Sequence, residues 1–398
     1  MTTYRRLTPR ATLLIILMLG LMVASSRLRA DNATCGGQTF TLPFTDVAGS
    51  PFLCQIAAAY FSGLTNGTSS TTFSPGSDVT REQMAAFMTR TQDSALKRGS
   101  RRAALNQWWT TTPHYDIGLG TTLAGSPVAV QSDGLDLWTA NNDGTASRIR
   151  ASDGKLLETW TFPSVGSARD VLIAMGRVFV TGNDGSLNMI DPSQPPGTTT
   201  KVVAGIGGGP YLMTFDGDRI WLVRADTVYI ITPAAAAPWQ VNTVSGFNSL
   251  GGIVHDGGNV WVTNAQGIIG SLYKLDANAN IIQTVSVGRD PSSPVFDGRN
   301  IWVPNLSTNS VTVVRESTGV VIATLTGNGM DGPIRGAFDG ERILIVNRFG
   351  NNVSLWKAAD LTPIGSFPLP VGSIPFGACS DGLNFWITLT GISKLGRF

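Results

Sequence analysis

A unit of 40 to 42 residues recurs seven times between residues 133 and 398, and it constrains the fold more than any other feature of the sequence. Each copy begins with Asp-Gly, except the second, which begins with Met-Gly, and a large apolar residue follows four or five positions later. Such regular spacing indicates one supersecondary unit per copy. The copies begin at Asp133, Met175, Asp216, Asp256, Asp297, Asp339 and Asp381, and their apolar residues are Trp138, Phe179, Trp221, Trp261, Trp302, Leu344 and Trp386.

Each copy contains short runs of β-branched residues separated by turn formers, as in Asn300–Asn305, Ser310–Val314 and Gly319–Leu325. These runs predict three strands, and the run before Asp-Gly predicts a fourth. Four strands in about 40 residues are typical of a β-propeller blade, with Asp-Gly in the tight turn between the first two strands. Seven copies therefore predict seven blades and a mainly β fold.

The last copy has room for only three strands before Phe398, whereas Tyr115–Ala124 precedes the first copy as a candidate strand without a blade. Pairing this strand with the last copy would complete the ring and cover sheet edges that otherwise promote aggregation. We therefore predict a seven-bladed propeller over residues 107–398, with an N-terminal strand closing the last blade.

The copies resemble the YVTN-type β-propeller repeats of bacterial and archaeal surface proteins over residues 114–398. Asn259–Asn264 and Gly319–Thr324 are the closest stretches, while Leu222–Arg224 lacks the usual Asn. The resemblance implies the fold but no particular activity, because propellers serve as ligand binders, scaffolds and enzymes.

The amino terminus has the pattern of an export signal. Arg5, Arg6 and Arg10 precede Ala11–Ala24, an uncharged apolar run of 14 residues. This predicts a signal peptide over residues 1–30, cleaved after Ser26 or Ala30. An uncleaved membrane anchor is the alternative, because basic residues also follow the run.

Charge and cysteine content narrow the possible partners. Residues 1–30 carry five Arg and no acid, so the rest of the chain has 24 basic and 27 acidic residues, a net charge of −3. This balance argues against nucleic-acid binding.

Export permits a disulfide between Cys35 and Cys54, although spacing alone does not fix their distance. Cys379 lies in an apolar strand pattern and is predicted to be a buried free thiol.

Residues 31–106 are predicted to form a small helical module. Apolar residues recur at helical spacing between Ser50 and Leu64, and a turn-forming Thr-Asn-Gly run follows. A second helix is expected near Thr80, with Asp78 as its cap and Met84, Phe87 and Met88 on its apolar face.

This module resembles the S-layer homology family through Phe44–Val47, Asn66-Gly67, Phe73–Gly76 and Val79–Ala86, in that order. The resemblance implies noncovalent attachment to the bacterial cell surface through an anionic polysaccharide linked to peptidoglycan, with Arg81 contacting the polymer. A guanidinium beside a helix amino terminus is a suitable carboxylate clamp. The alternative is that Arg81 only pairs with a neighbouring carboxylate on a solvated surface.

Members of that family commonly carry three such modules, whereas this chain shows one. Association of several chains into a homo-oligomer through the module would supply the missing avidity. The basic residues between Arg90 and Arg102 could strengthen contact with an acidic polymer, or simply favour a helix carboxyl end.

The sequence offers little for catalysis and calls for no cofactor. It has two histidines, His114 and His255, and no Gly-x-Ser-x-Gly, His-Glu-x-x-His or phosphate-binding loop. His255 occupies a position that is Phe in neighbouring copies, so a packing role is favoured. We expect a noncatalytic adhesion or scaffolding protein. The alternatives are a secreted lyase resembling the streptogramin-inactivating propellers, which use a histidine and a divalent metal, and a lattice subunit.

Ligands of a propeller commonly bind the loops that join the second and third strands and that enter each new blade. Five arginines fall on such loops and could bind a carboxylated or sugar ligand. A solvated face with scattered ion pairs is the alternative. These arginines are Arg169, Arg224, Arg289, Arg335 and Arg348.

Overall fold

The computed structural model describes residues 32–35, 38–61, 64–98, 119–163, 165–207, 209 and 212–398. The chain divides into two compact units, Met1–Thr112 and Pro113–Phe398. The predicted signal peptide at residues 1–30, the boundary predicted between residues 106 and 107, and His114 lie outside the described residues. None of the helices in the described part is long and apolar enough to cross a membrane.

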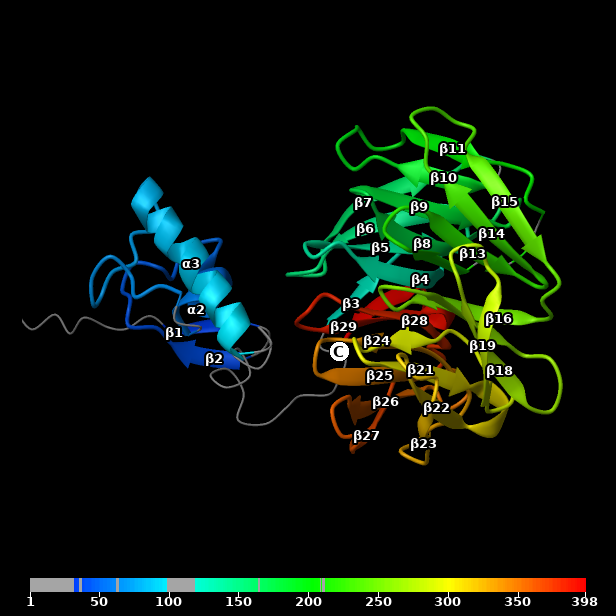
Figure 1. Cartoon of the computed structure of the whole chain (residues 1–398). Coiled ribbons are helices and arrows are strands. Elements are labelled where there is room, and N and C mark those ends of the chain that lie inside the picture. Colours follow the sequence, from blue (N-terminus) through cyan, green and yellow to red (C-terminus); the bar gives the residue numbers. More distant parts are fainter. Residues whose placement is uncertain are drawn as a thin grey trace, which may run out of the picture. The chain divides into compact units, whose positions relative to one another are not determined.

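The described residues of the first unit form two helices and a hairpin that the sequence did not predict (Figure 1). Strands β1 (Asn32–Cys35) and β2 (Gln38–Thr41) pair antiparallel, and helices α2 (Leu53–Phe61) and α3 (Arg81–Arg98) follow. A disulfide joins Cys35 at the end of β1 to Cys54 in α2. The hairpin and the first helix are thereby linked covalently.

The core of this unit lies between the hairpin and α2. Leu42, Phe44 and Val47 are fully buried there, together with Ile56 and Ala57 of α2. The same unit leaves apolar residues of α3 in solvent, since Met84 and Met88 are 49% and 66% exposed. The face expected to pack inward is therefore largely uncovered.

Thr80, and not Asp78 as predicted, caps α3. The Thr80 hydroxyl accepts a hydrogen bond from the backbone N–H of Gln83 at 3.1 Å, and the Gln83 side-chain oxygen accepts one from the N–H of Thr80 at 2.9 Å. This reciprocal pair is a capping box, which needs an acceptor three residues before its partner. Asp78 stands two residues too early for it.

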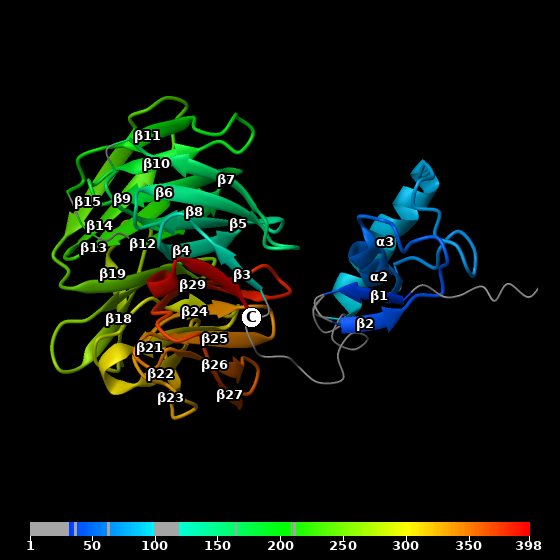
Figure 2. The same cartoon turned by 180° about the vertical axis from the view of Figure 1, so that it is seen from behind.

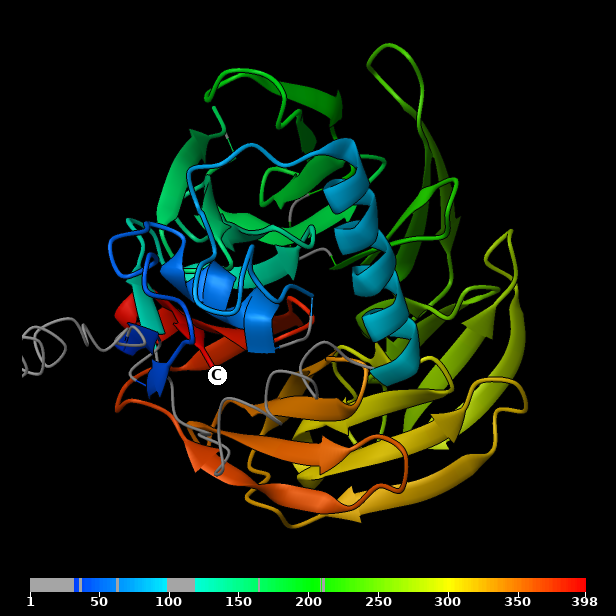
Figure 3. The same ribbon diagram turned by 90° about the vertical axis from the view of Figure 1, so that its left-hand side faces the viewer.

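The second unit forms seven four-stranded antiparallel sheets, and these are the predicted blades (Figure 2). In Figure 3 they follow one another around a ring, from green through yellow to red. We number them in chain order, with the first strand of each blade contacting those of its neighbours. Blades 1 to 3 are β4 (Pro127–Ser132), β5 (Asp136–Asn141), β6 (Thr145–Arg150) and β7 (Leu156–Thr161); β8 (Ala168–Ala174), β9 (Arg177–Gly182), β10 (Leu187–Ile190) and β11 (Thr199–Val203); and β12 (Leu212–Phe215), β13 (Ile220–Arg224), β14 (Thr227–Thr232) and β15 (Gln240–Ser245).

The remaining four blades repeat the same order of strands. Blade 7 differs in taking its fourth strand, β3, from the start of the unit. Blades 4 to 7 are β16 (Leu250–His255), β17 (Val260–Asn264), β18 (Gly270–Leu275) and β19 (Ile281–Val287); β20 (Val295–Phe296), β21 (Asn300–Asn305), β22 (Ser310–Arg315) and β23 (Val321–Thr326); β24 (Pro333–Phe338), β25 (Arg342–Asn347), β26 (Asn352–Lys357) and β27 (Pro363–Pro368); and β28 (Pro375–Ser380), β29 (Phe385–Leu389), β30 (Lys394–Arg397) and β3 (Leu119–Thr122). Short 3₁₀ turns, η1 (Leu306–Thr308) and η2 (Thr390–Ile392), follow β21 and β29.

Strand β3 closes the ring by pairing antiparallel with β30, from Leu119 opposite Arg397 to Thr122 opposite Lys394. The hydroxyl of Thr121 also donates to the carbonyl of Gly154 in blade 1, at 2.7 Å. One short strand thus joins the two ends of the repeat array.

The repeated Asp-Gly turn is held by the same contacts in five blades. One carboxylate oxygen of the Asp accepts the backbone N–H groups two and three residues later, and the other accepts the indole N–H of the repeated Trp at 2.6 to 3.0 Å. In blade 5 these residues are Asp297 and Trp302. The Asp therefore forms the turn, as predicted, and also anchors the buried indole, which the sequence analysis missed.

The two blades without this Trp show why the pair recurs. In blade 6, Leu344 replaces the indole, and Nε of Arg342 donates to Asp339 instead, at 2.9 Å. In blade 2, Phe179 offers no donor, and Met175 stands where the other copies have Asp. Among the seven copies, Asp therefore stands at this position only where a Trp or Arg side chain can donate a hydrogen bond to it.

Candidate functional site

Arg81 is the first residue of α3 and is exposed to solvent. The capping box beside it fixes the first turn of the helix, so Arg81 stands at the helix end toward which the backbone N–H groups point. Asp46, in the first motif of the module, accepts N–H groups from Phe73 and Ser74 at 2.8 to 3.2 Å and so holds the loop before α3. The motif residues therefore organise the segment that presents Arg81.

Two of the five predicted propeller arginines come together on one aromatic ring. The guanidinium carbons of Arg335, in β24, and Arg348, just after β25, lie 5.0 and 5.3 Å from the ring centroid of Phe376, in β28. A cation over an aromatic face is attracted by the ring quadrupole. The side chain of Arg348 is exposed, whereas the side chain of Arg335 is only 15% exposed.

Arg335 also forms an ion pair across the ring. Its Nη1 lies 3.6 Å from the carboxylate of Asp170, which belongs to β8 of blade 2, and this carboxylate accepts the N–H of Met213 in blade 3 at 2.9 Å. We call Asp170, Arg335, Arg348 and Phe376 the axial cluster. It connects first strands from blades that are far apart in sequence.

Burial dominates the electrostatics of this pair. Burial raises the pKa of Asp170 above its ordinary value, although Arg335 and the N–H of Met213 favour the ionised form. Burial likewise lowers the pKa of Arg335, and Asp170 opposes that shift. Each charge thus depends on the other, because an unpaired charge at this depth would be strongly disfavoured.

The other three predicted arginines lie elsewhere. Arg169 donates to the side-chain oxygens of Asn142 and Asn183 at 3.4 and 3.5 Å. The guanidinium of Arg224 packs over the backbone of Gly207 and Gly209. The side chain of Arg289 is 56% exposed, and its Nε lies 3.7 Å from the carboxylate of Asp290. The five arginines therefore do not form a single site.

His255, in β16, is half-buried and lines a pocket of about 210 Å³ between blades 3 and 4. Asp218, Asn259 and Asp276 also border this pocket. Within the described ranges, no group of three or more His, Cys, Asp or Glu residues could hold a metal ion. The described residues around His255 include no such group.

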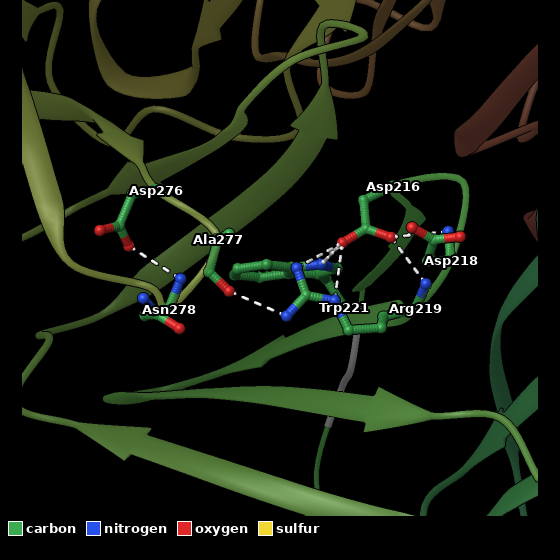
Figure 4. Close-up of polar contacts among 7 residues, drawn as sticks. All are labelled: Asp216, Asp218, Arg219, Trp221, Asp276, Ala277 and Asn278. Carbon is green, nitrogen blue, oxygen red and sulfur yellow. Dashed lines mark hydrogen bonds and ion pairs between the residues drawn. The ribbon is translucent and has the colours of Figure 1, made fainter.

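The carboxylate of Asp216, which also borders this pocket, is hydrogen-bonded to other side chains of the protein (Figure 4). Asp216 accepts the indole N–H of Trp221 at 2.6 Å and two N–H groups of the Arg219 guanidinium at 2.9 and 3.1 Å. Arg219 also donates to the carbonyl of Ala277 in blade 4 at 2.9 Å. This cluster is a bridge between blades.

The repeat could have revealed the partner of Arg335. Asp170 and Arg335 are both the third residue of a first strand, in Ala168-Arg-Asp170 and Pro333-Ile-Arg335. Equivalent positions of a propeller face the same axis, so superposing the copies places opposite charges at one level. The sequence pattern placed Arg335 on a candidate binding face without indicating Asp170 as its partner.

Comparison with family models identifies residues 43–85 as an S-layer homology domain. No curated protein matches the chain.

Several solved structures share the fold of the second unit. A catalytically inactive variant of virginiamycin B lyase from Staphylococcus aureus, solved with quinupristin, is 16% identical, with a TM-score of 0.58 over 70% of this chain and 97% of that one. A streptogramin B lyase is 17% identical, with a TM-score of 0.57 over 70% and 96% of the two chains. The β-propeller domain of Cps50 (Swd1) from Myceliophteria thermophila is 10% identical, with a TM-score of 0.56 over 70% and 99%.

At these identities the likeness shows the fold alone. The S-layer homology domain indicates association with the cell surface, because such domains generally bind cell-wall polysaccharides. The chain thus carries an S-layer homology domain at residues 43–85, followed by a seven-bladed β-propeller.

Proposed function

We propose that this protein is exported and held noncovalently at the bacterial cell envelope by its S-layer homology domain, with the propeller serving as a noncatalytic module for adhesion or scaffolding. The observation that carries the proposal is the domain match at residues 43–85, with exposed Arg81 at the start of α3. The proposed partner of Arg81 is an anionic polysaccharide linked to peptidoglycan.

The uncovered face of α3 supports association of several chains through this domain. Met84 and Met88 stand one helical turn apart and are largely exposed, and Phe52, just before α2, is 63% exposed. Burying apolar area of this kind favours self-association. Several copies of one domain would then bind the polymer together, which raises avidity without any new contact.

Co-sedimentation of the full chain with purified cell-wall sacculi tests the anchor. Arg81→Gln removes the proposed contact and is expected to weaken binding at least about tenfold, because charge-assisted hydrogen bonds to a carboxylate are among the stronger polar contacts. Arg289→Gln, which removes an exposed arginine of the propeller, is the matched control and should sediment like the unaltered chain.

Three results would contradict the proposal. The first is failure of the unaltered chain to sediment with sacculi. The second is sedimentation of the Arg81→Gln variant equal to that of the unaltered chain, which would exclude Arg81 from the contact. The third is loss of binding in the Arg289→Gln variant, which would move the wall contact to the propeller.

A further inference from the structure

Blade 5 contains an open groove that no part of the proposed function uses. Its volume is about 550 Å³, within the range of ligand sites in proteins. The groove lies between the Asp-Gly turn, the turn after β22 and the start of β23. It is lined by Arg299, Arg315, Glu316, Ser317, Thr318, Val320 and Ile322.

Two charged residues of this groove have polar atoms without partners. Nη1 of Arg315 and Oε2 of Glu316 are covered by the protein, yet neither has a hydrogen-bond partner among the described residues. A covered polar atom without a partner is unfavourable. A ligand that supplies an acceptor to Arg315 and a donor to Glu316 would relieve this, after a small rotation of each side chain.

Comparison between blades shows that Arg315 lacks a partner that its counterpart has. Arg150 ends the third strand of blade 1, as Arg315 does in blade 5, and it pairs at 3.1 Å with Asp153, three residues later. In blade 5 the residue three positions later is Thr318. The repeat position that neutralises the arginine in blade 1 is therefore uncharged in blade 5.

The groove also has an aliphatic side. Val320 and Ile322, at the start of β23, are 57% and 40% exposed. Exposed aliphatic residues next to unpaired charges of both signs form an amphiphilic surface, which is best satisfied by a ligand carrying all three features.

We propose that this groove binds a small zwitterion with an aliphatic portion, either a free amino acid or a short peptide. The guanidinium groups of Arg315 and Arg299 receive the carboxylate, since a guanidinium matches the geometry of a carboxylate. Glu316 receives the ammonium group, and Val320 and Ile322 contact the aliphatic side chain.

Calorimetric titration of the full chain with four probes tests the ligand class. L-leucine and leucylalanine carry both charges, N-acetyl-leucine lacks the ammonium group, and leucinamide lacks the carboxylate. We expect saturable binding with a Kd below about 10 mM for at least one of the first two probes, and binding at least about tenfold weaker for both blocked probes. Binding of leucine identifies a free amino acid as ligand, and binding of leucylalanine alone identifies a peptide.

Variants locate the site. Glu316→Gln preserves shape and removes charge, and Arg315→Gln removes the guanidinium; each should weaken binding of the better zwitterion at least about tenfold. Arg150→Gln is the matched control and should bind normally. The proposal is overturned if neither zwitterion binds, if a blocked probe binds as tightly as its zwitterion, or if both groove variants bind normally while remaining folded by circular dichroism.

Discussion

The bond between Asp297 and Trp302 gives the sharpest test of how the propeller is held together. Trp302 is fully buried, and its neighbours Ile343, Ile345 and Trp356 belong to the next blade. Its indole nitrogen lies 2.7 Å from the carboxylate of Asp297. The side chain therefore acts both in packing between blades and in holding a turn.

Two substitutions separate these contributions. Trp302→Ala removes the packing and the hydrogen bond, and large-to-small changes of buried Trp lower the free energy of unfolding by about 3–5 kcal/mol. Trp302→Phe keeps most of the volume and removes the donor, so its cost should be near that of one hydrogen bond to a charged group, about 2 kcal/mol.

Urea denaturation of the full chain, followed by circular dichroism in the β region, measures both changes. Combining Trp302→Phe with Asp297→Ala completes a double-mutant cycle, and a coupling energy of about 1–3 kcal/mol is expected for the direct bond. A loss below about 1 kcal/mol for Trp302→Ala would refute its buried position between blades. Zero coupling would refute the turn-anchoring role of the indole.

Three further predictions concern single ionisable groups. Arg335→Met should lower the free energy of unfolding by about 3–5 kcal/mol in thermal melts, because the buried carboxylate of Asp170 loses its opposite charge, whereas the double change of Arg335→Met and Asp170→Leu should restore much of the loss. Burial alone would raise the pKa of Asp256, but hydrogen bonds from Trp261 and two backbone N–H groups lower it below its ordinary value. The contribution of Asp256 to stability is thus complete above its unfolded pKa and lost as pH falls through its folded pKa, and Asp256→Asn should flatten the acid limb of a urea-midpoint profile. Cys379, predicted to be a buried thiol, is half-buried, and desolvation raises the pKa of its thiol well above the ordinary value, so alkylation by iodoacetamide at pH 8 should be slow in the native protein and fast in urea.

The number of blades was predictable from sequence because each copy is one structural unit. The Asp-Gly turns and buried indoles recur at fixed spacing, and spacing alone determines how many four-stranded sheets the chain can form. The closing strand was predictable by the same count, and β3 lies within the predicted segment.

Local chemistry was harder to predict than architecture. Asp78 and Thr80 are both good caps, and only the position of Gln83 relative to the helix start decides between them. The β1–β2 hairpin consists of two four-residue strands without strong alternation, so it had little signal of its own.

The sites depended on contacts that no local pattern contains. Asp170 and Arg335 are 165 residues apart and meet only because the ring closes. The groove in blade 5 is defined by a missing partner for Arg315, and the absence of a contact becomes visible only when the surrounding atoms are placed.

The closing strand β3 has a mechanical consequence for a protein tethered through its first unit. A force that pulls on the chain before the propeller loads the first strand of this unit that the structure describes, β3, which begins at Leu119. This strand has four residues and pairs with one strand, β30; beyond that pairing, the hydroxyl of Thr121 donates to the carbonyl of Gly154 in blade 1, so few bonds share the load. We therefore expect blade 7 to unfold first under load. Loss of β3 would open the ring, while the other six blades keep all four of their strands.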